Sequence, residues 1–241
     1  MLVGKHALVA RCKSQLNSLY IDGVNLDFSP KVRNLGVLFG ESLFFKDHIS
    51  AIFRSSFLYL KNLKTLRSHF DKKSFEVIVH AFVTSRLDYC NSLFSGLPSS
   101  TLRPLTLIQN FAARLIMRRG KFSSATPLLK ELHWLPIPYR IRFKVLLLTY
   151  KALHSLGPSY LTSLLTPRPM VRSLRSNNHL LLQVPRSRSV RFGDCSFSVY
   201  APKLWNSLPL CIRLANSVSS FKSLLKTHLF GKAFGDDLVC S

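Results

Sequence analysis

The stretch SFEVIVHAFVTSRLDYCNSLFSGLP, residues 74–98, predicts the central element of the fold. Its apolar residues recur at the i, i+3, i+4 and i+7 positions of a helix and would form one wide buried face. They are Phe75, Ile78, Val79, Phe82, Val83, Leu87, Cys90, Leu93 and Phe94. Asp71 is a suitable N-cap, and Gly96 followed by Pro98 is typical of a helix end. We expect a core helix of about six turns that is covered by neighbouring elements.

Amphipathic segments on both sides supply those neighbours. Residues 43–69 predict a second helix, whose apolar side consists of Phe45, Ile49, Ile52, Phe53, Leu60 and Leu63. Residues 101–120 predict a third helix, with Ser99 or Ser100 as its N-cap and Gly120 as the residue after its end.

The remaining chain divides into shorter segments. Further helices are expected at 139–155, at 159–165 and at 217–230, the last with Ser219 or Ser220 as its cap. Residues 5–40 are interpreted as β structure because they contain HALVA, an Asp22–Gly23 turn signal and the alternating KVRNLGVLFG. Residues 196–213 have a strand-like start and an apolar segment with Trp205.

Together these patterns predict a mainly α fold with a small N-terminal β element, an α+β class. The expected domain divisions are a β element at 1–40, a helical bundle at 41–165 and a basic, partly irregular region with short strands and a closing helix at 166–241.

The charge of the chain is strongly positive, since 34 Lys and Arg oppose 11 Asp and Glu for a net charge of +23. Most of the excess lies after residue 88, where the only acids before residue 236 are Glu131 and Asp194. Such a charge excludes an ordinary neutral enzyme surface and favours a polyanionic partner.

Two groups of basic residues are candidates for phosphate contacts. The first is Arg114, Arg118, Arg119 and Lys121 at the end of the third predicted helix, although cations there could equally serve the helix dipole. The second lies in residues 166–193, which contain no acid and could hold an ordered hairpin around LLLQV. Its arginines are Arg168, Arg172, Arg175, Arg186, Arg188 and Arg191, and the alternative is a loop that is basic only for solubility.

Catalytic patterns are absent from the sequence, which has no GxSxG, HExxH or P-loop motif, so no catalytic residue, cofactor or metal site is predicted. Asp236 and Asp237 resemble the aspartate pair of polymerases, but only four residues follow them, which leaves no second strand for such a site. Trp134 is interpreted as a packing residue, with a base-stacking platform as the alternative.

Other polar residues have structural interpretations. Arg86 and Asp88 are expected to form ion pairs with neighbouring helices, and His133 and His154 to pack or cap.

The cysteine spacing and the length of the apolar runs bear on localisation and on membrane association. The five cysteines have no metal-ligand spacing and are interpreted as reduced thiols of an intracellular protein, in either nucleus or cytoplasm. No apolar run approaches a membrane span, and the first 13 residues do not read as a signal peptide.

Four blocks in fixed order resemble a known family. They are VRNLGVLFGESLFFKDHI (32–49), HAFVTSRLDYCNSLFSGLP (80–98), LHWLPIPYRIRFKVLLLTYKALHSLGPSYL (132–161), and APKLWNSLPLCIR (201–213) with SFKSLLKTHLF (220–230). They resemble the part after the polymerase core of jockey-like, non-LTR (LINE-type) retrotransposon reverse transcriptases. The resemblance covers residues 5–230.

This resemblance implies a thumb-like helical bundle and C-terminal region without the catalytic palm aspartates or the endonuclease. Residues 5–40 would then be a palm edge whose partner sheet is missing, which is an aggregation hazard. The implied function is a non-catalytic fragment that binds RNA or an RNA–DNA hybrid through the backbone, with no membrane partner. The alternatives are an inactive retroelement remnant and a recruited protein-interaction module.

Overall fold

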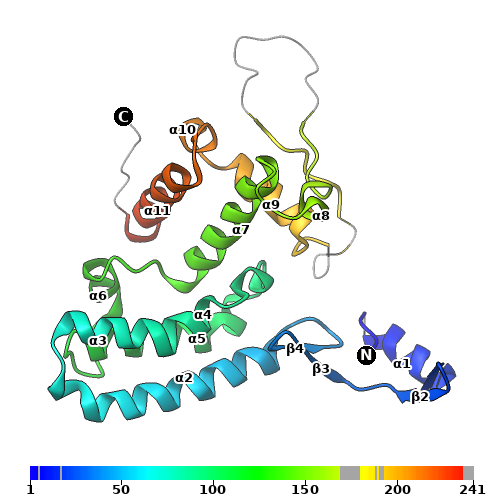
Figure 1. The fold of residues 1–241 in the computed structure, drawn as a ribbon, viewed down its shortest axis with the longest axis horizontal. Helices are drawn as coiled ribbons and strands as arrows, with labels where there is room; N and C mark the ends of the chain where they lie inside the picture. Colours follow the sequence, from blue (N-terminus) through cyan, green and yellow to red (C-terminus); the bar gives the residue numbers. More distant parts are fainter. Residues whose placement is uncertain (5, 17, 169–179, 188, 190–192, 236–241) are drawn as a thin grey trace, which may run out of the picture.

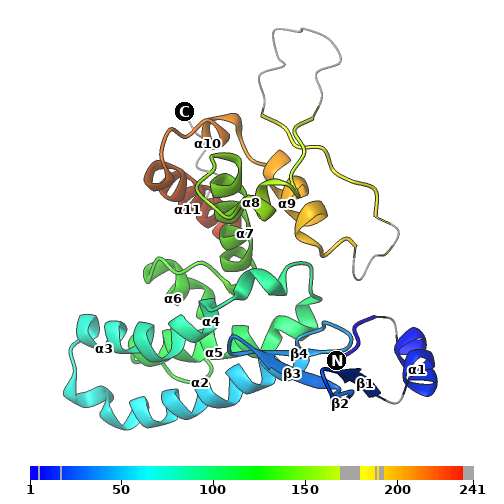
Figure 2. The same ribbon diagram turned by 45° about the vertical axis from the view of Figure 1, so that its right-hand side comes forward.

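The computed structural model describes residues 1–235 except 5, 17, 169–179, 188 and 190–192. The described chain is mainly helical with two short antiparallel strand pairs near its N-terminus, which confirms the predicted fold class. Its longer helices form two groups that follow each other along the chain (Figures 1 and 2).

The N-terminal region consists of one helix and two hairpins. The hairpins join β1 (Ser18–Ile21) to β2 (Val24–Asp27) and β3 (Lys31–Asn34) to β4 (Val37–Gly40). The predicted Asp22–Gly23 turn is confirmed, and both of its residues have positive φ, 48° and 81°, as a tight hairpin turn of this length requires.

The β interpretation of HALVA is wrong, because it forms part of α1 (His6–Gln15). The four apolar residues after His6, taken alone, suggest a strand. The ten residues of α1 also include arginine, lysine and glutamine, which with alanine and leucine favour a helix.

The first helical group contains the central stretch and its partners. Its members are α2 (Lys46–Leu66) with the 3₁₀ turn Arg67–His69, α3 (Lys72–Val79), α4 (Ser85–Asp88), α5 (Ser99–Ile116) and α6 (Ala125–Glu131). The helix predicted at 43–69 is therefore confirmed, and the Asp71 cap is confirmed as well. The Asp71 carboxylate accepts hydrogen bonds from the backbone N–H groups of Lys73 and Ser74, at 3.0 and 3.3 Å.

The single long helix expected over residues 74–98 is not continuous. A π-helical turn (His80–Thr84) joins α3 to α4, the helix ends at Asp88, and Cys90 adopts a left-handed conformation with φ 52°. A 3₁₀ turn (Asn91–Phe94) then returns Phe94 to the core, where it is 1% exposed. The apolar spacing continues across the break, so the pattern does not reveal it.

Three helix ends differ from expectation. Ser99 lies inside α5, and Pro98 precedes it. The left-handed residue that ends α5 is Arg118 rather than Gly120. The hydroxyl that caps α11 (Val218–Phe234) belongs to Ser217, which accepts from the N–H of Ser220 at 3.1 Å.

The second helical group contains α7 (Ile137–Leu153), α8 (Ser159–Thr162), α9 (Phe197–Asn206), α10 (Leu210–Arg213) and α11. The strand-like start predicted after Ser196 is wrong, because helix α9 begins at Phe197. Its buried residues Val199, Pro202 and Trp205 recur every third position, which is helical rather than alternating spacing. The Tyr150 and Phe221 rings stack at 4.2 Å in the centre of this group.

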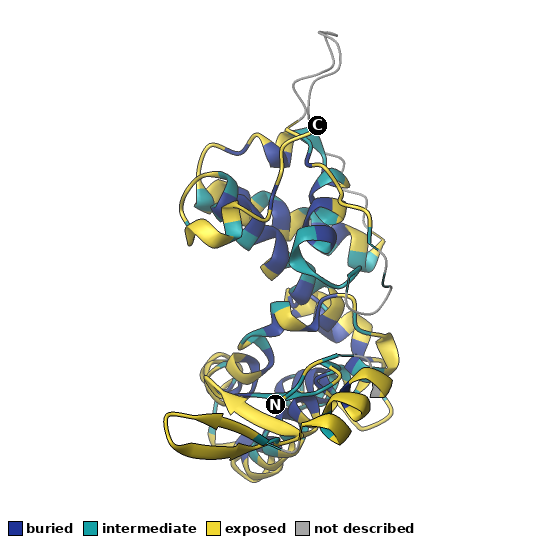
Figure 3. Cartoon of the chain, turned by 90° about the vertical axis from the view of Figure 1, so that its right-hand side faces the viewer, coloured by how far each residue is buried: buried dark blue, intermediate teal, exposed yellow. Residues whose placement is uncertain are grey.

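Each group has its own cluster of buried apolar residues, and α7 contributes to both. Ile137 and Ile141 pack in the first cluster, while Val145 and Leu146 pack in the second. Figure 3 shows the buried positions inside both groups and the β1–β2 hairpin almost entirely exposed.

Candidate nucleic-acid interface

The first predicted basic patch lies on the turn between α5 and α6. The backbone N–H of Arg119 donates to the Arg114 carbonyl at 2.9 Å, and that of Arg118 donates to the Leu115 carbonyl at 3.3 Å. This is the Schellman arrangement, in which the left-handed position is usually glycine. Here Arg118 occupies it with φ 51°.

Arg114 serves the structure of this turn. Its Nε donates to the Ser123 carbonyl at 2.8 Å, and the Ser123 hydroxyl and N–H both donate to the Gly120 carbonyl, at 2.7 and 3.1 Å. The other three basic residues are exposed and form no ion pair among the described residues; we call Arg118, Arg119 and Lys121 the turn cations.

A buried arginine that the sequence analysis did not select supports the same helix end. Arg67 is 8% exposed, and its guanidinium donates to the carbonyls of Leu115, Ile116 and Phe70 at 3.1, 2.9 and 2.8 Å. Burial, and secondarily the nearby Arg118, lower the pKa of Arg67. Since Arg67 already neutralises the carbonyl end of α5, that end does not require the turn cations.

The second predicted patch is described only in part. Arg168 and Arg186 are exposed, whereas Arg172, Arg175, Arg188 and Arg191 lie outside the described residues. The expected hairpin around LLLQV is present at its base. There the Arg168 N–H donates to the Leu181 carbonyl at 2.9 Å, and the Gln183 N–H donates to the Thr166 carbonyl at 2.8 Å.

Two residues of α9 hold this base in place. The Asn206 side chain exchanges hydrogen bonds with the backbone of Leu182, at 2.9 and 2.8 Å, and the Trp205 indole donates to the Leu180 carbonyl at 2.8 Å. This base belongs to the second helical group, and the α5–α6 turn belongs to the first. The described part of the second patch, Arg168 and Arg186, therefore lies in a different helical group from the first patch (Figures 1 and 2).

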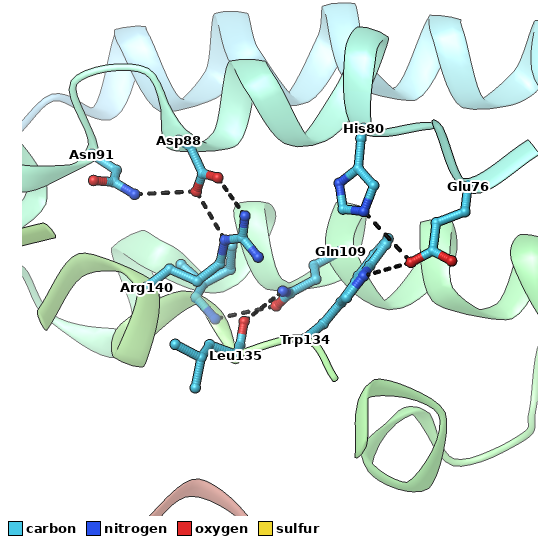
Figure 4. A network of polar contacts seen from close by, with 9 residues as sticks. Glu76, His80, Asp88, Asn91, Gln109, Trp134, Leu135 and Arg140 are labelled. Carbon is cyan, nitrogen blue, oxygen red and sulfur yellow. Dashed lines mark hydrogen bonds and ion pairs between the residues drawn. The ribbon is translucent and has the colours of Figure 1, made fainter. Parts of the chain in front are cut away.

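A cleft of about 620 Å³ lies between the two groups. Figure 4 shows the polar network along it. The Glu76 carboxylate accepts from the Trp134 indole at 3.1 Å and lies 3.5 Å from His80. Asp88 forms a two-point ion pair with Arg140 of α7, one contact of which is 2.8 Å.

The ion pair predicted for Asp88 is thereby confirmed, while that of Arg86 is wrong. Arg86 lies over the Tyr59 ring at 4.6 Å and donates to its hydroxyl at 3.2 Å.

Gln109 extends this network into the core. It is 1% exposed, donates to the Leu135 carbonyl at 2.8 Å and accepts from the Ile137 N–H at 3.1 Å. Trp134 is 4% exposed, which confirms the packing interpretation and excludes the ring as an accessible stacking platform. Both residues therefore hold the segment before α7 against the first group.

Three exposed lysines also line the cleft, namely Lys144 of α7 and Lys222 and Lys226 of α11. These lysines are scattered along the chain, so no cluster of basic residues in the sequence indicates them. The i, i+4 spacing of Lys222 and Lys226 beside the apolar residues of the closing helix does indicate that these two lysines lie on one face of that helix. Among the described residues these lysines form no ion pair, so they add positive charge to the cleft.

Most described acids are already engaged, which leaves the basic excess uncompensated. The engaged pairs are Glu41 with Lys13, Asp47 with Lys31, Asp88 with Arg140, Glu131 with Lys72, and Asp194 with Lys203. Asp71 caps α3, and Glu76 holds Trp134.

The histidines singled out in the sequence have the expected structural roles. The His133 ring lies 5.7 Å from that of Phe230, and His154 Nδ1 lies 2.9 Å from the Tyr150 carbonyl at the end of α7.

Within the part of the chain that the structure describes, no group of three His, Cys, Asp or Glu could hold a metal ion. Asp236 and Asp237 lie beyond it. No described helix is both long and apolar enough to cross a membrane.

Comparisons with protein-family models, with curated proteins and with solved structures give no match for this chain. The resemblance to reverse transcriptases therefore stays a prediction from the sequence blocks.

Proposed function

We propose that this chain is a non-catalytic, nucleic-acid-binding part of a retrotransposon reverse transcriptase. It would hold RNA or an RNA–DNA hybrid by electrostatic contacts with phosphates. The observation that carries the proposal is the α5–α6 turn, where the turn cations are exposed beyond a helix end that Arg67 already neutralises. Guanidinium groups bind phosphate oxygens in a bidentate way, and phosphate contacts fix position without reading sequence.

The proposal is tested by removing the turn cations together, as Arg118→Ala, Arg119→Ala and Lys121→Ala. Each lost phosphate contact should lower the slope of log affinity against log salt by about 0.7 to 0.9. We therefore expect weaker binding of a labelled RNA–DNA hybrid and a salt slope lower by about 2 to 3, with the helical circular dichroism signal retained.

The matched control removes the same charge elsewhere, as Arg11→Ala, Lys46→Ala and Lys73→Ala, all exposed residues. If the control weakens binding as much as the turn variant, the effect belongs to net charge and not to this turn.

The second patch is tested in the same way by changing Arg172, Arg175, Arg186 and Arg188 to alanine together. Unchanged binding in that variant would remove the second patch from the proposal.

A second candidate is a retroelement remnant without activity of its own. The observation that favours it is the β1–β2 hairpin, where Leu19, Ile21, Val24 and Leu26 are 45–55% exposed. A hairpin with so much exposed apolar surface would be better placed at the edge of a larger sheet. A remnant should aggregate or melt without cooperativity, whereas a binding module should be monomeric with a sharp thermal transition.

A further inference from the structure

Phe122, in the turn that carries the turn cations, is the most exposed large apolar side chain of the described chain, at 96%. A single exposed apolar residue needs no explanation by itself. The surroundings of this one are unusual. Lys121 Nζ lies 5.8 Å from the ring centroid, and Arg118 and Arg119 precede it in the same turn.

The turn that presents Phe122 is held on both sides. Ser123, the next residue, is bound to Arg114 and Gly120 through its carbonyl, N–H and hydroxyl groups. Before it, the Schellman hydrogen bonds fix the backbone of Arg118 and Arg119. The ring of Phe122 is thus exposed on a backbone that hydrogen bonds already fix, so binding of a partner costs little conformational entropy in this turn.

We propose that Phe122 is a stacking platform for an unpaired base of a single-stranded nucleic acid, whose phosphates contact the turn cations. The inference rests on the proposed function and adds to it: the turn cations contact phosphates of a duplex or of a single strand, and the ring adds affinity for the single strand alone. Proteins that bind single strands combine cations along the backbone with aromatic rings on which bases stack. In a duplex the bases are already stacked and paired, so the ring has no free base face to cover.

The same composition could suit an anionic membrane surface, but the turn offers only one exposed apolar side chain. Residues 118–121 are exposed and are either charged or glycine. Interfacial membrane binding depends on a broad buried apolar area in addition to positive charge. The nucleic-acid partner is therefore the better match.

The test compares Phe122→Ala with the wild type for binding of a short labelled single strand and of the duplex made from it. Stacking of one base predicts single-strand affinity lower by about 5- to 100-fold, with the salt slope unchanged because the cations remain. Duplex affinity should stay the same. The thermal melt should also be unchanged, since the ring is 96% exposed and packs against no core.

The matched control is Tyr20→Ala. Tyr20 is an aromatic residue that is 76% exposed on the β1–β2 hairpin, which carries Asp22 and Asp27 and no basic residue. This variant should bind both nucleic acids like the wild type.

A second readout uses Phe122→Trp, because the native Trp134 and Trp205 are 4% and 0% exposed. The new indole should be quenched by the single strand and not by the duplex.

The remaining outcomes distinguish failure of the stacking role from failure of the proposed function. Wild-type affinity in Phe122→Ala, or an equal loss for duplex and single strand, would overturn the stacking role and leave the proposed function standing. No binding of any nucleic acid by the wild type would remove both. Binding to vesicles of anionic lipid that depends on Phe122, without any effect on the oligonucleotide, would identify a membrane partner and overturn the inference.

Discussion

At the scale of single residues, Arg67 shows how one side chain can order a helix end. The positive charge of Arg67 suggests an exposed residue, but its position, four residues after Leu63 and seven after Leu60, continues the apolar stripe of the helix at 43–69. The structure buries it, and its guanidinium satisfies three carbonyls while lying 4.7 Å from the Phe75 ring centroid. The hydrogen bonds to Leu115 and Ile116 join residues 48 and 49 positions apart, so local pattern could not reveal these two partners.

We expect Arg67→Ala to destabilise the chain by about 3 kcal/mol, because it leaves buried carbonyls of α5 without their charged donor. The stability of Arg67→Lys should lie between those of the wild type and Arg67→Ala, since an ammonium group keeps the charge but cannot reproduce the planar fork of hydrogen-bond donors in the guanidinium. Urea unfolding followed by circular dichroism measures both. The control is Arg54→Ala, an exposed cation of α2, and equal stability of Arg67→Ala and Arg54→Ala would contradict this role.

His48 is the residue from which we expect a pH dependence. It is 6% exposed, and burial, with a smaller contribution from Arg33, lowers its pKa below 6.5. The unfolded chain therefore binds a proton more readily than the folded chain below that value. The stability that the chain gains from keeping His48 neutral is complete above about pH 6.5, and it is lost as the pH falls below that value and through the lowered pKa of His48.

The expected result is a lower thermal midpoint at about pH 5 than at about pH 7.5, with a smaller difference in His48→Gln. His228 has its pKa lowered by burial and by Lys232, so part of the difference should persist in that variant. Thermal melts at matched ionic strength measure this. An identical pH difference in wild type and His48→Gln would rule out His48 as its source.

At the scale of elements, long amphipathic segments were predictable and breaks between them were not. The helices near 43–69 and 217–230 show a sustained apolar period, and Asp71 and the Asp22–Gly23 turn have recognisable local chemistry. By contrast, the left-handed conformations of Cys90 and Arg118 have no sequence signature, since glycine is the residue usually found there. The central helix and the end of α5 were misplaced for this reason.

Arg118 provides a test at this scale, because it couples helix termination to binding. We expect Arg118→Gly to stabilise the chain by about 1 kcal/mol, since glycine adopts positive φ without the steric cost of a β-carbon. The same change should weaken binding of an RNA–DNA hybrid and lower the salt slope by about one. Denaturant unfolding and fluorescence anisotropy measure the two effects.

The matched control is Arg119→Gly, which removes the same charge from a position without positive φ. It should weaken binding similarly and give no gain in stability. A stability gain in both variants, or in neither, would contradict the role assigned to the Arg118 backbone.

At the scale of the whole molecule, α7 makes the two helical groups depend on each other. Its first turns pack in one core and its later turns in the other, and Gln109 and Arg140 tie its start to α5 and α4. The sequence predicted a helical bundle but could not show that the buried residues would divide at this helix. Such a division depends on contacts between residues far apart in the chain.

One tryptophan lies in each core, Trp134 in the first and Trp205 in the second. In Trp134→Phe and in Trp205→Phe, the remaining indole reports on a single group. We expect the fluorescence and far-ultraviolet circular dichroism transitions in urea to coincide within each variant, as for one cooperative unit. Separate midpoints would mean that the groups unfold independently and that α7 does not couple them.

The central claim concerns the uncompensated positive charge, which composition revealed and which the structure locates partly on the α5–α6 turn and in the cleft. It is tested most directly by anisotropy titration of the purified chain with a labelled RNA–DNA hybrid at two salt concentrations, after a thermal melt. We predict a cooperative melt and binding that weakens about 10³-fold or more between about 50 and 200 mM salt, as for six or more phosphate contacts. Weak binding that is indifferent to salt would contradict the account.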